Sequence, residues 1–101
     1  RGVLRARFVA AALATLAAGV NAAPAVIYEM GGKFDKSFNQ AAWEGAERWK
    51  RETGKTYLEF EIASPAQREQ AVRRFAERGA SPVVAIGFPM ASAVDKVAAA
   101  F

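Results

Sequence analysis

Short apolar runs alternate with helical patterns along the chain after residue 24, and this alternation constrains the fold more than any other feature. The apolar runs, rich in residues that favour β-strands, cover residues 25–30, 57–62 and 82–88. Each is followed by a segment whose apolar residues recur at helical spacing. Strand–helix alternation with short turns is typical of βαβ units, in which the strands are parallel and the crossovers right-handed. The sequence therefore predicts an α/β fold with a parallel three-stranded βαβαβα arrangement.

The order of the strands follows from the polarity of the second run. Glu59 and Glu61 alternate with β-forming residues there, whereas the other two runs are almost wholly apolar. Such alternation favours an edge strand with one face in water. The first and third strands are then neighbours, which gives the order 2-1-3. Ligands bind to such sheets beyond the carboxyl ends of the strands, where the order reverses. Residues 31–39 and 87–90 are therefore the two candidate site segments.

Two segments carry the signature of a helix start. Ser37 and Ser64 are each followed three residues later by Gln, the pattern of a capping box. We expect the first helix to run from Ser37 to Gly54, and the second to have Pro65 at its first helical position and to stop at Gly79. The residues expected on the buried faces are Phe38, Ala42, Gly45, Ala46 and Trp49 in the first helix, Ala71, Val72, Phe75 and Ala76 in the second, and Met90, Ala93, Val94, Val97, Ala98 and Phe101 in the third. The side chains expected to face water are Arg68, Arg73, Arg74 and Arg78.

The first 22 residues have the three parts of a secretory signal. Arg1, Arg5 and Arg7 form a basic start, residues 8–20 carry no charge, and small or medium-sized residues precede a cleavage point after Ala22. The apolar run is too short to cross a membrane, which takes about 20 apolar residues. A buried Ala-rich helix is the alternative interpretation. Because the sequence has no cysteine to carry a lipid, we expect a soluble, periplasmic mature protein.

The net charge of +4 is concentrated in that signal. Three of the fourteen Lys and Arg residues and none of the ten Asp and Glu residues lie in it, so eleven basic residues face ten acidic ones from residue 23 onward. A nucleic-acid partner is therefore not expected. The chain has no Cys and no His, which excludes disulfides, thiol and imidazole catalysis, and Cys/His metal sites. We predict no catalytic residues, no metal and no cofactor.

The loop GGKFDKSFN, residues 31–39, contains the main candidate ligand contacts. It is not a phosphate-binding loop, because Asp35 takes the place of the glycine before the Lys-Ser pair. Asp35 either prepares the helix start or accepts hydrogen bonds from a polar ligand. Ser37 is favoured as a cap over a ligand contact. Phe38 either packs in the core or walls the cleft and stacks on a planar ligand. Asn39 can both donate and accept at the cleft mouth.

Further candidates lie at the ends of the first and third strands. Glu29 is a carboxylate near the end of an apolar run, so it requires solvent, a lysine such as Lys33, or a ligand. Gly87 permits close backbone approach after the third strand. Phe88 is either a second apolar wall of the cleft or a core residue on the hinge side. Trp43 lies off the main apolar stripe of the first helix.

The chain from Ala25 to Phe101 resembles the Bmp-like substrate-binding proteins of ABC transporters, also called basic membrane proteins or purine-nucleoside receptors. The resemblance rests on AVIYEMGGKFDKSFNQAAWEGAERW, on SPAQREQAVRRFAERGA and on PVVAIGFPMASAVDKVA. The DKSFN core followed by a Gly-containing helix is its most specific part. The family implies a type I periplasmic-binding-protein fold, in which two α/β lobes close on a ligand. Residues 23–101 are then an incomplete, N-terminal part of the first lobe of a longer chain.

The same resemblance implies a function. Several family members bind nucleosides, with the base stacked on an aromatic side chain from each lobe. By position, Asp35, Phe38 and Asn39 match ligand contacts, with Phe38 as the stacking ring of the first lobe. Glu29 stands where relatives often have Asp. The resemblance implies a monomeric, non-enzymatic receptor that delivers a nucleoside-like ligand to an ABC permease in the inner membrane.

One departure and two alternatives belong to this interpretation. Many family members are lipoproteins, whereas this sequence has no cysteine. One alternative function is an enzyme on a similar α/β scaffold with its catalytic residues downstream. The other is a periplasmic sensor domain that uses the same fold without transport.

Overall fold

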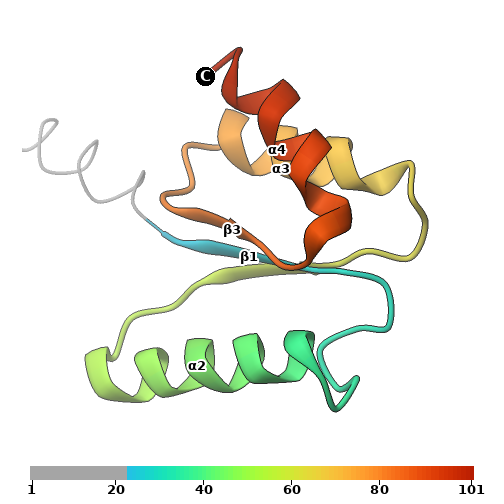
Figure 1. Ribbon diagram of the computed structural model, residues 1–101. Coiled ribbons are helices and arrows are strands. Elements are labelled where there is room, and N and C mark those ends of the chain that lie inside the picture. Colours follow the sequence, from blue (N-terminus) through green and yellow to red (C-terminus); the bar gives the residue numbers. More distant parts are fainter. Residues whose placement is uncertain (1–22) are drawn as a thin grey trace, which may run out of the picture.

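The computed structural model describes residues 23–101, and the predicted signal in residues 1–22 lies outside this part. Strands and helices alternate along the described chain as predicted (Figure 1). The elements are β1 (Ala25–Tyr28), α2 (Phe38–Thr53), β2 (Leu58–Glu61), α3 (Gln67–Glu77), β3 (Val83–Ala85), the short 3₁₀ helix η1 (Phe88–Met90) and α4 (Ala91–Ala98).

β1 is the central strand of a three-stranded parallel sheet with the order β2-β1-β3. Ala25 lies opposite Leu58 of β2 and Val83 of β3. The predicted α/β fold and the 2-1-3 strand order are thus confirmed. All four residues of β1 are buried, whereas β2 is mostly exposed. This difference is what a central strand and a half-polar edge strand should show.

The strands are shorter than the apolar runs that predicted them. β1 ends at Tyr28, although the run continues through residue 30. The backbone N–H and C=O of Glu29 bond to the side chain of Asn39 rather than to a neighbouring strand. The chain therefore leaves the sheet at this point and enters the loop before α2. After β3, Gly87 adopts a φ of +99°, which turns the chain into η1.

Helices α3 and α4 cover one face of the sheet, and α2 lies on the other face (Figure 1). The main hydrophobic core lies on the side of α3 and α4, where Ile27, Phe75 and Val97 belong to one buried cluster. The other buried members of the cluster are Ala25, Ile62, Ala71, Val72, Met90 and Ala93. Fully burying a large apolar side chain contributes about 1.5–3 kcal/mol, so this side of the sheet supplies most of the described packing.

The predicted apolar stripe of the last helix is only partly buried. Val94 is 38% exposed and Phe101 65% exposed, and Ala98 is exposed as well. The prediction that these residues are buried was wrong, because α4 packs against α3 along a single narrow face. The members of the stripe that do reach the core are Met90, Ala93 and Val97.

Helix α2 packs less closely against its face of the sheet. Asn39 is the one fully buried α2 residue in the described structure. Of the predicted inner stripe, Phe38 is 79% exposed and Gly45 is exposed, which corrects both predictions. Phe38 is the first residue of α2, and α2 begins at the carboxyl edge of the sheet (Figure 1), so no strand lies beneath its ring. The half-buried members of the stripe are Ala42, Ala46 and Trp49.

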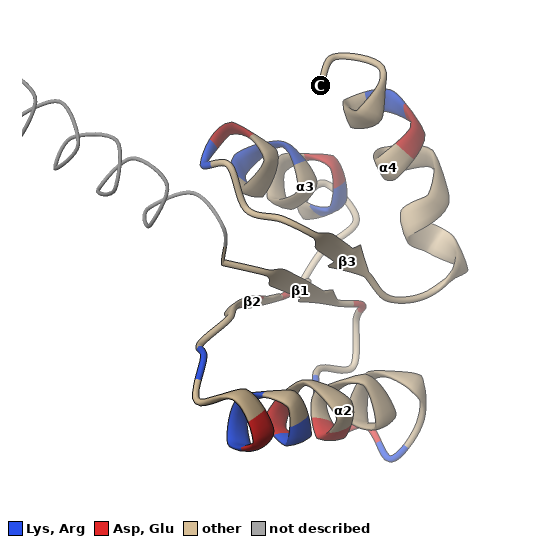
Figure 2. Cartoon of the chain, turned by 90° about the vertical axis from the view of Figure 1, so that its left-hand side faces the viewer, with Lys and Arg blue, Asp and Glu red and all other residues tan. Residues whose placement is uncertain are grey.

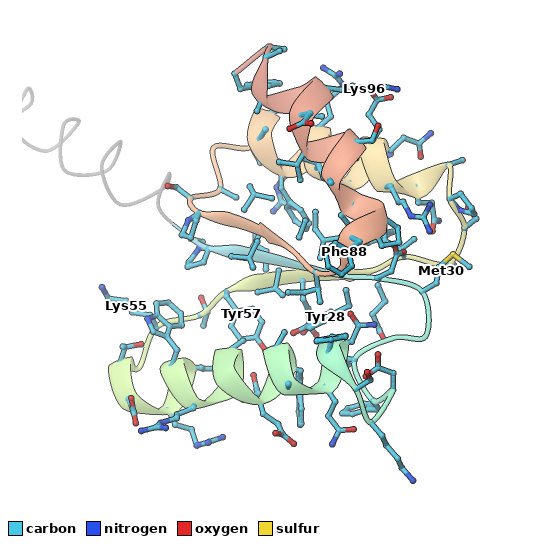
Figure 3. The ribbon with its side chains drawn as sticks, viewed as in Figure 1. Tyr28, Met30, Lys55, Tyr57, Phe88 and Lys96 are labelled. Carbon is cyan, nitrogen blue, oxygen red and sulfur yellow. The ribbon has the colours of Figure 1, made fainter. Side chains whose placement is uncertain are left out.

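Two tyrosines lie between α2 and the sheet (Figure 3). The Tyr57 hydroxyl donates to Oε2 of Glu47 at 2.7 Å. Tyr28 is fully buried, and its hydroxyl has no hydrogen-bond partner in the described part of the chain. Burial raises the pKa of Tyr28 to about 12. Burial, followed by the hydrogen bond to Glu47, raises the pKa of Tyr57 as well.

The first predicted capping box does not form, because Gln40 bonds to Lys36 instead of Ser37, and the second forms only through its glutamine. Ser37 is the N-cap of α2, but its side chain makes no capping hydrogen bond. Gln40 Oε1 accepts from the backbone N–H of Lys36, and Gln67 Oε1 accepts from that of Ser64. The prediction that the second helix has Pro65 at its first position was wrong, and the helix begins at Gln67. Residues 64–66 form a turn instead, with hydrogen bonds between residues three apart. Gly54 ends α2 as predicted, with φ +71°.

Candidate functional site

A groove lies at the carboxyl ends of β1 and β3, where the strand order reverses. It is lined from three sides: by the start of α2, by the segment that follows β3, and by the first turns of α4. The lining residues that matter below are Phe38, Gly87, Phe88, Met90, Val94 and Asp95. The structure thus brings Phe38 to the predicted site segment 87–90, whereas the other residues of the segment 31–39 do not line this groove. This agrees with the position expected for ligands on an open α/β sheet.

Two phenylalanine rings project at this groove. Phe38, at the start of α2, is 79% exposed, and Phe88, the first residue of η1 (Figure 3), is 94% exposed. Both are far more exposed than a core residue, so packing within the described chain does not explain them. Binding grooves combine aromatic walls with a few polar groups, and such rings stack on planar ligands. The alternative interpretation of Phe38 as a core residue is therefore wrong.

Gly87 is required by the backbone that forms the floor of the groove. Its φ of +99° and ψ of 148° are a conformation that L side chains rarely adopt. A Cβ at this position would lie 3.5 Å from Cβ of Glu29 and 3.6 Å from Cδ of Pro89. These distances are ordinary van der Waals contacts, so the backbone conformation favours glycine here, and the neighbouring side chain is Glu29.

Asp35 organises the start of α2. Its Oδ1 accepts from the backbone N–H of Ser37 at 2.8 Å and from that of Gln40 at 3.0 Å. Desolvation raises the pKa of Asp35, but the backbone donors of Ser37, Gln40 and Asn39 outweigh it, and the pKa is lowered overall. The predicted role in preparing the helix start is confirmed. Both of these hydrogen bonds are accepted by Oδ1 and neither by Oδ2.

Asn39 is buried, with 2% of its surface exposed, and not open at the groove mouth. Its Nδ2 donates to the carbonyl oxygen of Glu29 at 2.8 Å, and its Oδ1 accepts from the N–H of Glu29 at 3.0 Å. An amide has two N–H donors and two acceptor lone pairs, so one of each remains. The first turn of α2 is thereby tied to the end of β1.

Glu29 forms an ion pair with Arg68 of α3, at 2.9 Å between Nε and Oε2. The prediction that Arg68 faces water was wrong, and so was the suggested pairing of Glu29 with Lys33. Lys33 bonds instead to Glu59 of β2, and its backbone N–H donates to Glu61. These contacts hold the loop before α2 across the end of β2, on the opposite side of β1 from the groove.

The same loop carries an aromatic pair that sequence reasoning missed. Phe34 meets Trp43 of α2 edge to face, with ring centroids 4.9 Å apart and an angle of 76°. One residue lies in a loop and the other in a helix, so no periodic sequence pattern predicts the contact. The pair explains why Trp43 lies off the main stripe of the helix.

Sequence reasoning also missed the α4 wall of the groove. Val94 was predicted to be in the core, and Asp95 was not considered, yet both line the groove. α4 directly follows the predicted site segment 87–90. This closeness in sequence is the signal that could have indicated Val94 and Asp95 as groove residues. The first turn of α4 carries no charged residue (Figure 2).

Between residues 23 and 101, no helix has the length and apolarity that a membrane span requires. In the same part of the chain, no three His, Cys, Asp or Glu side chains gather in a geometry that would hold a metal ion.

Comparison with known proteins shows the family to which the chain is similar. Residues 24–101 match the family model for the PnrA-like ABC transporter substrate-binding protein, named Bmp. An uncharacterized lipoprotein of Pyrococcus furiosus is 38% identical over 78 residues, which are 73% of this chain and 19% of that protein. The chain therefore spans about a fifth of the length of this curated relative. No solved structure matches the chain.

Proposed function

Since the chain belongs to the Bmp family of PnrA-like ABC transporter substrate-binding proteins, we propose that it is part of a receptor that captures a nucleoside-like solute for an ABC permease. The observation that carries the proposal is the groove with two exposed phenylalanines, Phe38 and Phe88, at the switch point of the sheet. A planar base fits such a pair, because aromatic rings stack on it at little entropic cost. The receptor is proposed to act as a monomer, without catalysis or a cofactor.

Polar residues close to Phe38 in the sequence are proposed to contact the sugar and the edge of the base. Asp35 keeps Oδ2 open while Oδ1 is held by the helix start, so its carboxylate is pre-oriented to accept from a hydroxyl or a ring N–H. The Ser37 hydroxyl makes no capping bond and can contact the ligand. Asn39 and Glu29 support the site indirectly, because buried Asn39 ties the first turn of α2 to the backbone of Glu29.

The groove described here is one side of the proposed binding cleft. We propose that the longer protein supplies a second α/β lobe, which closes over the ligand about a hinge. Phe38 and Phe88 would then form the wall of the first lobe, and the second lobe would cover their exposed faces. Their exposure of 79% and 94% fits a surface that is covered only when the cleft closes.

The proposed site of action is the periplasm. The pattern of residues 1–22 is that of an export signal cleaved after Ala22, directly before the first described residue. A receptor that works with an inner-membrane permease needs this location. Release of a product that begins at Ala23 into the periplasmic fraction, detected by N-terminal sequencing, tests this part.

Isothermal titration calorimetry of the full-length protein tests the ligand class. Adenosine, guanosine, inosine and cytidine should bind with negative ΔCp, since apolar surface is buried, whereas ribose alone should bind more weakly. Flavin mononucleotide tests whether any planar ring is sufficient. Absence of binding and of thermal stabilisation with all nucleosides would reject the nucleoside assignment while leaving family membership intact.

A further inference from the structure

The carboxylate of Glu29 is held by a residue from a distant helix. Nε of Arg68 donates to both carboxylate oxygens, at 2.9 Å to Oε2 and 3.2 Å to Oε1. The backbone N–H of Met30 donates to Oε1 at 2.8 Å, and Nη2 of Arg68 lies 3.8 Å from Sδ of Met30. Together these contacts fix the two charged groups relative to each other.

The ion pair lies directly behind the groove. Gly87 lines the groove, and a Cβ placed on it would lie 3.5 Å from Cβ of Glu29. On the side of α4, Arg68 shares a small polar cavity with Pro89, the residue after Phe88. A ligand between the two phenylalanine rings would therefore lie one backbone layer away from both charges.

The pair is also better shielded from water than the ion pairs along the helices. The side chain of Glu29 is 14% exposed and that of Arg68 is 25% exposed. The helical pairs Arg48–Glu52 and Arg73–Glu69 have side chains that are 41% exposed or more. Exposed pairs interact weakly and are screened by salt, whereas partly buried charges are screened much less. A change in the net charge of the Glu29–Arg68 pair should therefore change the electrostatic potential at the groove.

We infer that Arg68 is a positioning residue of the ligand site, and that its pairing with Glu29 sets the ligand charge accepted at the end of β1. While paired, the two side chains present no net charge to the groove, which favours an uncharged ligand there. Without Arg68, Glu29 would add a negative charge behind Gly87 and attract a cation. This inference rests on the proposed function, because it needs a ligand between Phe38 and Phe88.

The test compares two nucleosides of similar shape: adenosine, which is uncharged, and 1-methyladenosine, which is a cation at pH 7. Calorimetry on the full-length protein gives the ratio of their dissociation constants for each variant. Arg68→Met should shift this ratio about tenfold toward the cation, and Glu29→Gln should shift it about as far the other way, as expected for one unit charge at short range. The double variant should restore the wild-type ratio.

The design separates a charge effect from loss of folding. The added methyl group and the charge of Asp95 are the same in every variant, so they cancel in the comparison of ratios. Arg73→Met, on the same helix, is the matched control and should leave the ratio unchanged. Arg68→Lys keeps the charge and should stay near the wild-type ratio.

The outcomes distinguish the inference from the function on which it rests. If Arg68→Met weakens both nucleosides equally, Arg68 is merely structural and the inference is overturned. If the wild-type protein binds neither nucleoside, the proposed function is rejected and the inference falls with it. Opposite shifts in the two single variants, with recovery in the double variant, support both.

Discussion

The side-chain amide of Asn39 pairs with both backbone polar groups of Glu29, donating to its carbonyl oxygen at 2.8 Å and accepting from its N–H at 3.0 Å. One side chain thus continues the hydrogen bonding of β1 after the strand has ended. It also fixes the first turn of α2, and with it the ring of Phe38, relative to the end of the sheet. The groove depends on this contact, although Asn39 is buried beneath it.

Replacing Asn39 should therefore reduce stability more than a typical surface change. Asn39→Ala leaves the N–H of Glu29 without a partner and its C=O with only the bond from the N–H of Gly32, a loss that costs about 1–3 kcal/mol. Asn39→Asp keeps the acceptor but places a carboxylate against the carbonyl oxygen. The pKa of this carboxyl group should be raised in the folded state. The free energy of unfolding of the variant should therefore be greatest in acid and fall as the pH rises. Urea unfolding of the full-length protein at pH 4 and pH 7 measures both effects, and equal losses at both pH values would contradict the second.

Gly87→Ala should destabilise the protein, because alanine is strained at a φ of +99°. Residues held in such regions cost about 1–3 kcal/mol, and the displaced η1 should also weaken ligand binding. Gly45→Ala is the matched control, since Gly45 lies within α2 with nothing within 4 Å of an added Cβ. There the change should stabilise by about 0.5–1 kcal/mol. Thermal unfolding of both variants should give shifts of opposite sign.

Phe38→Ala and Phe88→Ala should lower affinity without lowering stability. Both rings are exposed, so the free energy of unfolding should change by less than about 0.5 kcal/mol. Stacking of a base on an aromatic ring contributes about 1–3 kcal/mol, so nucleoside binding should weaken by roughly 5- to 150-fold. Phe101→Ala serves as control, because Phe101 is 65% exposed and does not line the groove. Calorimetry measures the affinity for the nucleoside. Equal dissociation constants for all three variants would contradict the stacking role of Phe38 and Phe88.

Asp35 should make stability depend on pH in acid. Its pKa is lowered in the folded state, because backbone N–H donors at the start of α2 outweigh desolvation. The stabilisation is therefore present above the unfolded pKa of about 4 and is lost as the pH falls through the lower folded value. Asp35→Asn should be less stable than the wild type at pH 7, and the difference should shrink at pH 2–3. Denaturant unfolding across this range measures it; a constant difference would show that Asp35 does not titrate with folding.

Tyr57 should make stability depend on pH in alkali. Burial raises the pKa of Tyr57 and brings that of Tyr28 to about 12. A raised pKa means that stability is complete below the unfolded value of about 10 and is lost as the pH rises through the folded value. Tyr57→Phe should lose about 0.5–1.5 kcal/mol at pH 7 through the bond to Glu47. Between pH 10 and 12, the free energy of unfolding of Tyr57→Phe should also fall less steeply with pH than that of the wild type. Denaturant unfolding followed by circular dichroism measures it.

The arrangement of the sheet could be predicted because it depends on polarity patterns within single segments. Glu59 and Glu61 marked β2 as an edge strand, and the order 2-1-3 followed without any knowledge of contacts. The position of the groove followed in turn, because the carboxyl ends of parallel strands meet at one edge. Phe38 and Phe88 were therefore both named as candidates before their exposure was known.

The contacts that orient the site could not be predicted in this way. Arg68 lies 39 residues after Glu29 in the sequence, and their meeting depends on the rotation of α3 about its axis. Periodicity assigns a helix an inner and an outer face, but it does not place residues at the border between them. Arg68 and Val94 both lie on such borders, and both were assigned to the wrong face. The capping box at Ser37 failed for a related reason, since Asp35 offered the start of α2 a competing acceptor.

The central place of β1 has a consequence for the order in which the chain can fold during synthesis. β1 is made first, but one of its two neighbours, β3, is the last strand of the described part. Contacts between segments far apart in sequence form slowly, because the entropy of closing a long loop is lost before the contacts stabilise the chain. A ribosome-bound chain therefore carries β1 with one side unpaired until Val83–Ala85 has emerged. The proposed export requires a chain that has not yet folded, and this delay keeps β1, the strand nearest the proposed signal, unpaired on one side for the longest time.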